Sequence, residues 1–408
     1  MYENLAILFL FGLFYSILSG RFARMAVNGA VVYAAFGFLF GPIGLGLLDL
    51  SIEREGIRVL AELSLALILF SDASNADLSV VRRAIRLPGR MLLVGLPLVI
   101  LLGFGFGVLL FPGLALLEVA ILATMLAPTD AALGKAVVSN PVVPAPVREG
   151  LNIESGLNDG ICVPVLLTFL ALATVGAGEE GGTLLALTLV AEEIGIGLVV
   201  GVGLTVVASW ALKMSLQRGW LEGHWLGIPV GALAFSCFAL AQYVGGSGFI
   251  ACFTGGLAFS ALAPEPKHEL LGRAEGSGEI FSMVTWVVFG AAVMFQHPGS
   301  LDWRVVTYAV LSLTVIRMVP IFVSLTGLDM RANAKLFVGW FGPRGLASIV
   351  FVVMVMNEKL PGNDTLVATV VATVVLSIIA HGLTANPLAA RLGARFQSEN
   401  GTRNEATP

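Results

Sequence analysis

The chain has 408 residues, of which 57% are hydrophobic and only 12% carry a charge. Soluble domains have roughly 25% charged residues, so this composition excludes an ordinary soluble protein. The net charge of −4 gives no indication of nucleic-acid binding, and the three cysteines lie in apolar stretches and imply no disulfide framework. Apolar runs recur from the first residues to about residue 386. They predict an all-α polytopic membrane protein, because lipid satisfies no exposed backbone groups.

In chain order, a window of about 20 apolar residues predicts thirteen membrane helices. They are expected at residues 4–20, 26–48, 57–76, 91–111, 115–134, 150–175, 183–212, 224–244, 247–263, 279–296, 305–327, 335–356 and 365–386. Together they form a transmembrane domain over residues 1–396, followed by a short polar cytoplasmic tail at 397–408. The first span lacks a basic flank and a clear cleavage site, so we expect it to be retained.

The distribution of Lys and Arg indicates the orientation. With the N-terminus outside, seventeen of these residues fall in inner loops and the tail, and four fall outside. Two more, Arg317 and Arg344, lie within predicted spans. Because inner loops carry the excess of positive charge, we expect the N-terminus outside, the C-terminus in the cytoplasm, and a location in the cell (inner) membrane.

Two predicted spans carry a helix breaker near mid-membrane, followed at once by a charge. The fifth reads "ILATMLAPTDAALGKAVV", with Pro128-Thr129-Asp130, and the twelfth reads "LFVGWFGPRGLASIVFVV", with Pro343-Arg344-Gly345. Interrupted helices at matching places of two halves point to a transporter site. Residues 4–175 and 224–386 are then repeats, and the single linker helix at 183–212 makes them inverted.

The sixth span contains "ESGLND", at residues 154–159. At 100° per residue, Glu154 and Asn158 share one face, and Ser155 and Asp159 share a neighbouring face. We expect Asp159, Ser155 and Thr129 to form an oxygen-lined site for a monovalent cation. One carboxylate neutralises one such ion and can hold one proton instead.

A buried ionised Glu154 needs a partner, because an ionisable group inside the bilayer is costly. Arg344 and Arg317 are the only cations within predicted spans. We expect Arg344 to pair with Glu154, and Asn158 to bridge to Asp130 across the two helices. The alternative is that these polar groups only hold helices together.

Three motifs, "APTDAA" (127–132), "ESGLND" (154–159) and "GPRGLASI" (342–349), resemble those of the cation:proton antiporter-1 family of sodium/proton antiporters. The resemblance implies thirteen helices, a homodimer, and a core domain that moves like an elevator against a dimerisation domain. It implies that Asp159 binds cation or proton alternately, and that Arg317 matches a second family arginine. An amide beside the aspartate, as in Asn158-Asp159, resembles the electroneutral class.

Two positions depart from the family pattern. Ala131 stands where many members have proline, and "SDAS" (71–74) stands where many have an acidic-Gly-Gly motif. Asp72 is therefore either an inner gate or a helix cap. We expect His381 to be a packed helix residue rather than a pH sensor.

The sequence thus predicts a secondary antiporter that exchanges Na⁺, or Li⁺ or K⁺, for H⁺ without a cofactor. A cation channel and an organic-anion transporter on the same inverted repeat are alternatives. The second would need Arg344 for its substrate. A membrane enzyme is disfavoured, because the sequence shows no Ser/His dyad and no cluster of metal ligands.

Overall fold

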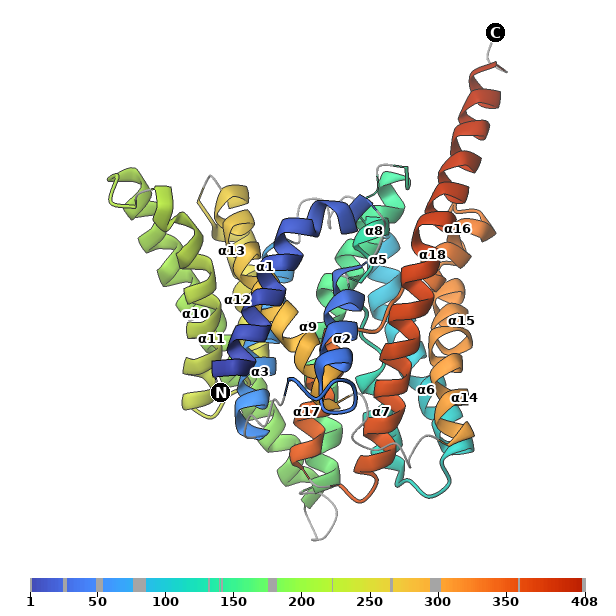
Figure 1. Cartoon of the computed structure of the whole chain (residues 1–408), viewed down its shortest axis with the longest axis horizontal. Helices are drawn as coiled ribbons and strands as arrows, with labels where there is room; N and C mark the ends of the chain where they lie inside the picture. The colour runs from blue at the N-terminus through green and yellow to red at the C-terminus, as the bar shows by residue number, and fades with distance from the viewer. Residues whose placement is uncertain are drawn as a thin grey trace.

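The computed structural model describes residues 2–24, 28–48, 54–75, 86–130, 133–138, 140, 142–174, 182–221, 223–264, 267–293, 302–358 and 360–405. Throughout these residues the regular structure is helical (Figure 1). Seven helices are long and apolar enough to cross a membrane, and five shorter apolar helices accompany them. Ala131 and residues 76–85 lie outside the described residues.

Each of the thirteen predicted spans has a helical counterpart in the part of the chain that the structure describes. The elements are α1 (Tyr2–Arg24), α2 (Gly29–Phe40), α3 (Arg54–Asn75), α5 (Arg86–Arg90), η1 (Met91–Gly95), α6 (Leu96–Leu110), α7 (Leu116–Met125), α8 (Lys135–Val138), α9 (Ala145–Thr174), α10 (Gly182–Gln217), η2 (Gly223–Gly227), α11 (Ile228–Tyr243), α12 (Gly248–Leu262), α13 (Lys267–Val288), η3 (Phe289–Val293), α14 (Trp303–Leu313), α15 (Val315–Ser324), α16 (Ala332–Trp340), α17 (Leu346–Asn357) and α18 (Asn363–Glu405).

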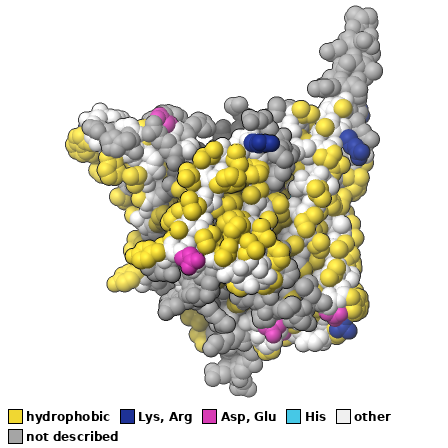
Figure 2. Space-filling view, in the orientation of Figure 1, with side chains coloured by type: hydrophobic (Ala, Val, Ile, Leu, Met, Phe, Trp, Pro, Cys, Tyr) yellow, Lys and Arg dark blue, Asp and Glu magenta, His cyan; other side chains and the backbone are white. Residues whose placement is uncertain are grey.

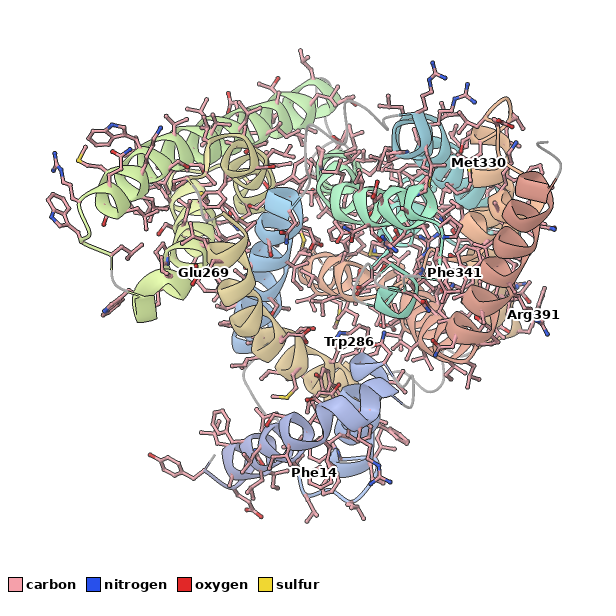
Figure 3. The ribbon with its side chains drawn as sticks, turned by 90° about the horizontal axis from the view of Figure 1, so that it is seen from above. Phe14, Glu269, Trp286, Met330, Phe341 and Arg391 are labelled. Carbon is pink, nitrogen blue, oxygen red and sulfur yellow. The ribbon has the colours of Figure 1, made fainter. Side chains whose placement is uncertain are left out.

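The helices pack as two groups. The scaffold group contains α1 to α3 and α10 to α13, and the core group contains α5 to α9 and α14 to α18. Figure 3 looks down on both, with Trp286 of the scaffold group beside the first two helices and Phe341 inside the core group. The groups meet where α9 packs against α3, α10 and α12, where α17 packs against α3, and where α18 packs against α2. Helix α9 therefore carries "ESGLND" at the boundary between them.

Glycines bring backbones of the scaffold group into direct contact. A Cβ atom at Gly201 of α10 would lie 2.2 Å from the carbonyl oxygen of Ala251 on α12. One at Gly37 of α2 would lie 2.1 Å from the carbonyl oxygen of Val287 on α13. Small residues permit such close approach of membrane helices. These two seams make the scaffold group a tightly joined unit.

Among the side chains that Figure 2 colours by type, most are hydrophobic and few are charged. On α1, Leu10, Phe14 and Ile17 are among the exposed large hydrophobic residues, and on α10 so are Val199 and Val207. Exposed apolar surface on this scale marks a face that meets lipid or another protein.

Both predicted interruptions are present. The fifth span stops as a helix at Met125 and resumes as α8, and the twelfth has non-helical residues 341–345 between α16 and α17. The structure adds a third interruption, since Thr314, with φ −110° and ψ −94°, separates α14 from α15. The predicted span 365–386 is part of a longer helix, because α18 runs to Glu405 and includes most of the predicted tail (Figure 1).

Candidate functional site

The two interrupted helices cross and bond to each other at their breaks. The backbone amide of Asp130 donates to the carbonyl oxygen of Pro343 at 2.8 Å. In return, Nη1 of Arg344 donates to the carbonyl oxygens of Ala127 at 2.7 Å and Pro128 at 2.9 Å. Each proline ends regular helix bonding on its own segment. The backbone groups released in this way find their partners on the opposite segment.

Each charged side chain at the crossing lies near a helix end whose partial charge has the opposite sign. Oδ2 of Asp130 accepts from the backbone amide of Leu346 at 2.9 Å, at the first turn of α17. The guanidinium of Arg344 lies against the carbonyl end of α7. Helix N-termini favour anions and C-termini favour cations. Gly345 permits this approach, since a Cβ there would lie 2.0 Å from Oδ2 of Asp130.

Glu154 pairs with Arg317, and our expectation that Arg344 would be its partner is wrong in this structure. Nη1 and Nη2 of Arg317 donate to Oε1 and Oε2 of Glu154 at 2.8 and 2.9 Å. Arg317 lies on α15, facing α9, whereas Arg344 is engaged by the carbonyl end of α7. Gly342 leaves room for this pair, because a Cβ there would lie 2.3 Å from Nε of Arg317.

The Asn158 side chain also differs from expectation. Its Nδ2 donates to Oγ1 of Thr129 at 2.6 Å and to Oε1 of Glu154 at 3.3 Å. We expected this amide to bridge to Asp130, whose carboxylate accepts instead from the backbone amides of Leu133 and Leu346. Asn158 lies on the same face of α9 as Glu154. In the structure this amide meets the Thr129 hydroxyl and not the Asp130 carboxylate.

Thr129 and Ser155 meet as predicted. Their hydroxyl oxygens lie 3.0 Å apart, and the Ser155 hydroxyl also donates to the carbonyl oxygen of Thr129 at 2.9 Å. Asp159 follows Ser155 one turn along α9 and is 6% exposed. Oδ1 of Asp159 and Oδ1 of Asn158 are buried without a hydrogen-bond partner in the described part of the chain. Buried polar atoms are normally partnered, so both oxygens are suited to a cation, and the Asp159 carboxylate oxygen is suited to a proton as well.

Asp72 lies near this oxygen cluster. It is half-buried near the end of α3, and its Cβ would be 3.4 Å from a Cβ placed on Gly156 of α9. Asp72, Asp130 and Glu154 all interact electrostatically with Asp159. The assignment of Asp72 as an inner gate or a helix cap stays a prediction.

The sequence did not indicate that α18 supports the crossing. Oγ of Ser377 accepts from the backbone amide of Arg344 at 2.7 Å, and His381 bonds to the end of α16. Ser348 of α17 also donates to the carbonyl oxygen of Met125 at 2.8 Å. The one signal in the sequence was the spacing of Ser377 and His381, because residues four positions apart lie on the same face of a helix.

Known proteins resemble this chain over most of its length. Residues 5–391 match the family model described as "Sodium/hydrogen exchanger, transmembrane". A probable Na⁺/H⁺ antiporter of Schizosaccharomyces pombe is 25% identical over 361 residues, which are 84% of this chain. The K⁺/H⁺ antiporter NhaP2 of Shewanella oneidensis is 23% identical over 352 residues, which are 85% of this chain. The chain spans 46% and 59% of the lengths of these two relatives.

A solved structure has the same fold. The sodium proton antiporter MjNhaP1 of Methanocaldococcus jannaschii, at pH 8, aligns with a TM-score of 0.77 at 18% identity. The alignment covers 93% of this chain and 99% of that one. The likeness of fold therefore extends over nearly the whole chain.

Proposed function

Because this chain belongs to the sodium/hydrogen exchanger family, we propose that it exchanges Na⁺, or another monovalent cation, for H⁺ across the cell membrane. One observation carries the proposal. Asp159 has a buried carboxylate oxygen without a partner among the described residues, and it lies one turn of α9 after Ser155, whose hydroxyl meets that of Thr129 at the crossing of the two interrupted helices. Oxygen ligands suit hard cations, and a carboxylate also binds a proton.

The mechanism is competition for Asp159. Cation and proton both neutralise the same carboxylate, so the site holds one or the other and exchanges them. Ser155 and Thr129 supply hydroxyl oxygens, and their mutual bonds keep them in place without using up their lone pairs. The gradients of the two ions set the direction of net exchange.

A count of charges at the crossing fits a single monovalent ion. Apart from the half-buried Asp72 at the end of α3, which this count leaves out, three buried or half-buried carboxylates (Glu154, Asp130 and Asp159) lie with two buried guanidiniums (Arg317 and Arg344). One negative charge remains, and one cation or one proton neutralises it. Buried charges require such compensation. We therefore propose a stoichiometry of one cation for each proton.

The two helix groups correspond to the moving parts. In our proposal the core group carries the site and moves against the scaffold group, which forms a homodimer through α1 and α10 in the cell (inner) membrane, with the N-terminus outside. The close seams of the scaffold group support the role of a fixed frame. The exposed apolar faces of α1 and α10 support contact with lipid or a second copy.

An organic-anion transporter is the second candidate, because Arg344 is not paired with Glu154 and its Nε and Nη2 have no hydrogen-bond partner in the described part of the chain. An anion would have to reach that guanidinium. The Arg344 side chain is 0% exposed and lies against the carbonyl end of α7. This burial favours a charge-compensating role, and cation exchange remains our proposal.

Flux measurements in proteoliposomes test the proposal. An outward proton gradient is imposed and its dissipation is followed after addition of Na⁺, K⁺ or Li⁺, with protein-free liposomes as the control. We expect dissipation that needs both the protein and a monovalent cation and saturates with cation concentration. Conduction without coupled proton movement would establish a channel, and dissipation only with an organic anion would establish the second candidate.

A further inference from the structure

His381 occupies a buried position on α18 next to the second break. Its side chain is 2% exposed and lies among the rings of Trp340, at 5.1 Å between centroids, and Phe341, at 6.2 Å. Trp340 is the last residue of α16, and Phe341 is the first residue of the break. His381 therefore contacts the point at which the twelfth span stops being a helix.

Both ring nitrogens of His381 face carbonyl oxygens. Nε2 lies 2.9 Å from the carbonyl oxygen of Trp340, and Nδ1 lies 2.9 Å from the carbonyl oxygen of Ser377. Carbonyl oxygens only accept hydrogen bonds, and a neutral imidazole has one N–H. A neutral ring therefore bonds one of these carbonyls and needs another donor for its second nitrogen.

Ser377 provides that donor. Its Oγ lies 3.2 Å from Nδ1 of His381 and accepts from the backbone amide of Arg344 at 2.7 Å. With a neutral ring, a chain of bonds runs from the Arg344 amide through the Ser377 hydroxyl to His381, and from His381 to Trp340. The chain joins the two sides of the break through α18.

Protonation of the ring changes this chain. Nδ1 then carries a hydrogen and donates to the carbonyl oxygen of Ser377, while Nε2 still donates to Trp340. The Ser377 hydroxyl loses its acceptor on the ring. The bond by which Ser377 donates to His381 is therefore lost, and only Nδ1 can then donate across that contact, whereas the bond to Trp340 of α16 persists.

Some groups around His381 disfavour a positive charge on its ring, and one helix end favours it. Arg344 of the break and Arg317 of α15 interact with it electrostatically and disfavour a further positive charge. The carbonyl end of α16 favours one. Helix α17 has no charged residue. The other ionisable groups on elements packed against α18, as far as the structure describes their side chains, are Lys335 on α16, Tyr308 and Arg304 on α14, Glu118 on α7 and Tyr33 on α2.

Contrary to our expectation from the sequence that His381 is a packed helix residue rather than a pH sensor, we propose that His381 and Ser377 form a proton-responsive clamp on the second break, so that the protonation of His381 sets part of the pH dependence of transport. His381 does not touch the ion in this proposal; it is a positioning residue that acts through Arg344. The inference rests on the proposed exchange function, and it gives α18 a regulatory role beyond packing.

The main variant is His381→Gln, whose amide can donate to the Trp340 carbonyl but does not take up a proton. Exchange rate is measured across about pH 5 to 8, where histidine changes charge. We expect His381→Gln to transport with a pH profile of altered shape. Ser377→Ala, which cuts the link while leaving His381 in place, should alter the profile in the same direction, and the double variant should match the single ones.

The matched control is Thr384→Val. Thr384 accepts a hydrogen bond from Nε1 of Trp340 at 2.9 Å, so this variant also removes a contact between α16 and α18, but no titrating group. Its pH profile should keep the shape of the wild type. A His381→Gln profile that superimposes on the wild type after scaling would overturn the clamp. So would a Thr384→Val profile altered in the same way.

A second readout does not depend on transport. The melting temperature of the purified protein in detergent is measured over the same pH range, and we expect the difference between wild type and His381→Gln to change with pH. A constant difference would overturn the clamp, and failure of the wild type to exchange any cation would instead overturn the proposed function. If His381→Gln does not fold, His381→Asn and Ser377→Ala are judged by the same criteria.

Discussion

Arg317 and Glu154 meet through two parallel hydrogen bonds, and each side chain is 1% exposed. The residues are 163 positions apart, on α15 of one repeat and α9 of the other. A forked pairing of guanidinium and carboxylate fixes orientation as well as distance. The pair therefore joins the two predicted repeats, and Glu154 also accepts from Thr129 and Asn158.

Removing one member of this pair should destabilise the protein more than it changes cation affinity. Arg317→Ala or Glu154→Gln leaves a buried polar or charged group uncompensated, at a cost of roughly 3–5 kcal/mol. Thermal unfolding in detergent measures the effect. The control is Arg304→Ala, since Arg304 and Asp302 form an exposed ion pair at 3.9 Å, worth about 0–1 kcal/mol. Normal stability with altered cation affinity would instead assign Glu154 to the transport site.

Asp159→Asn should abolish exchange without unfolding the protein. The amide keeps the shape of the side chain but neither binds a proton reversibly nor neutralises a cation. Cation-dependent dissipation of a proton gradient in proteoliposomes is the measurement. Glu192→Gln makes the same chemical change at an exposed position on α10 and should transport normally. Wild-type rates in Asp159→Asn would refute competition for this carboxylate.

Gly345→Ala should impair transport strongly, because its Cβ would overlap Oδ2 of Asp130 and push the two breaks apart. Gly203→Ala is the matched control. A Cβ at Gly203 of α10 would meet no atom within 4 Å, and alanine there favours the helix by about 1 kcal/mol. We expect Gly203→Ala to be at least as stable as the wild type. Equal activity of the two variants would show that contact between Asp130 and the second break is dispensable.

Exchange should be insensitive to membrane potential. Each crossing of the core group carries one cation or one proton, so the net charge moved per cycle is zero. A potential acts only on net charge, at about 2.3 kcal/mol per charge per 100 mV. The potential is set in proteoliposomes with valinomycin, or with a thiocyanate gradient if K⁺ is transported. A reproducible shift of the final Na⁺ or pH gradient would indicate that Asp130 or Asp72 also titrates.

The sequence was sufficient to predict the interrupted helices and the meeting of Thr129 with Ser155. Helix breakers and buried polar groups are local signals, and a proline followed by a charge in an apolar run has few interpretations. The signal for each membrane span is also local, because it depends on about 20 consecutive residues.

The choice between Arg317 and Arg344 as partner of Glu154 could not be made in this way. It depends on the rotation of α15 and on which guanidinium the carbonyl end of α7 engages, and both follow from packing between distant segments. His381 is a packed helix residue, as expected, but the contacts that Ser377 and His381 make with the second break could not be predicted for the same reason. Their partners, Arg344 and Trp340, lie 33 and 41 residues away, across a break and a turn.

The distance between Glu154 and Arg317 along the chain also bears on biosynthesis. The ribosome adds about 5–20 residues per second, so the 163 residues between them take ~8–30 s to make. During that interval α9 leaves the ribosome with Glu154 while its counter-charge has yet to be translated. The nascent first repeat must therefore remain in a hydrated or chaperoned setting, or insert with Glu154 protonated. The polar centre of the protein assembles only when the second repeat arrives.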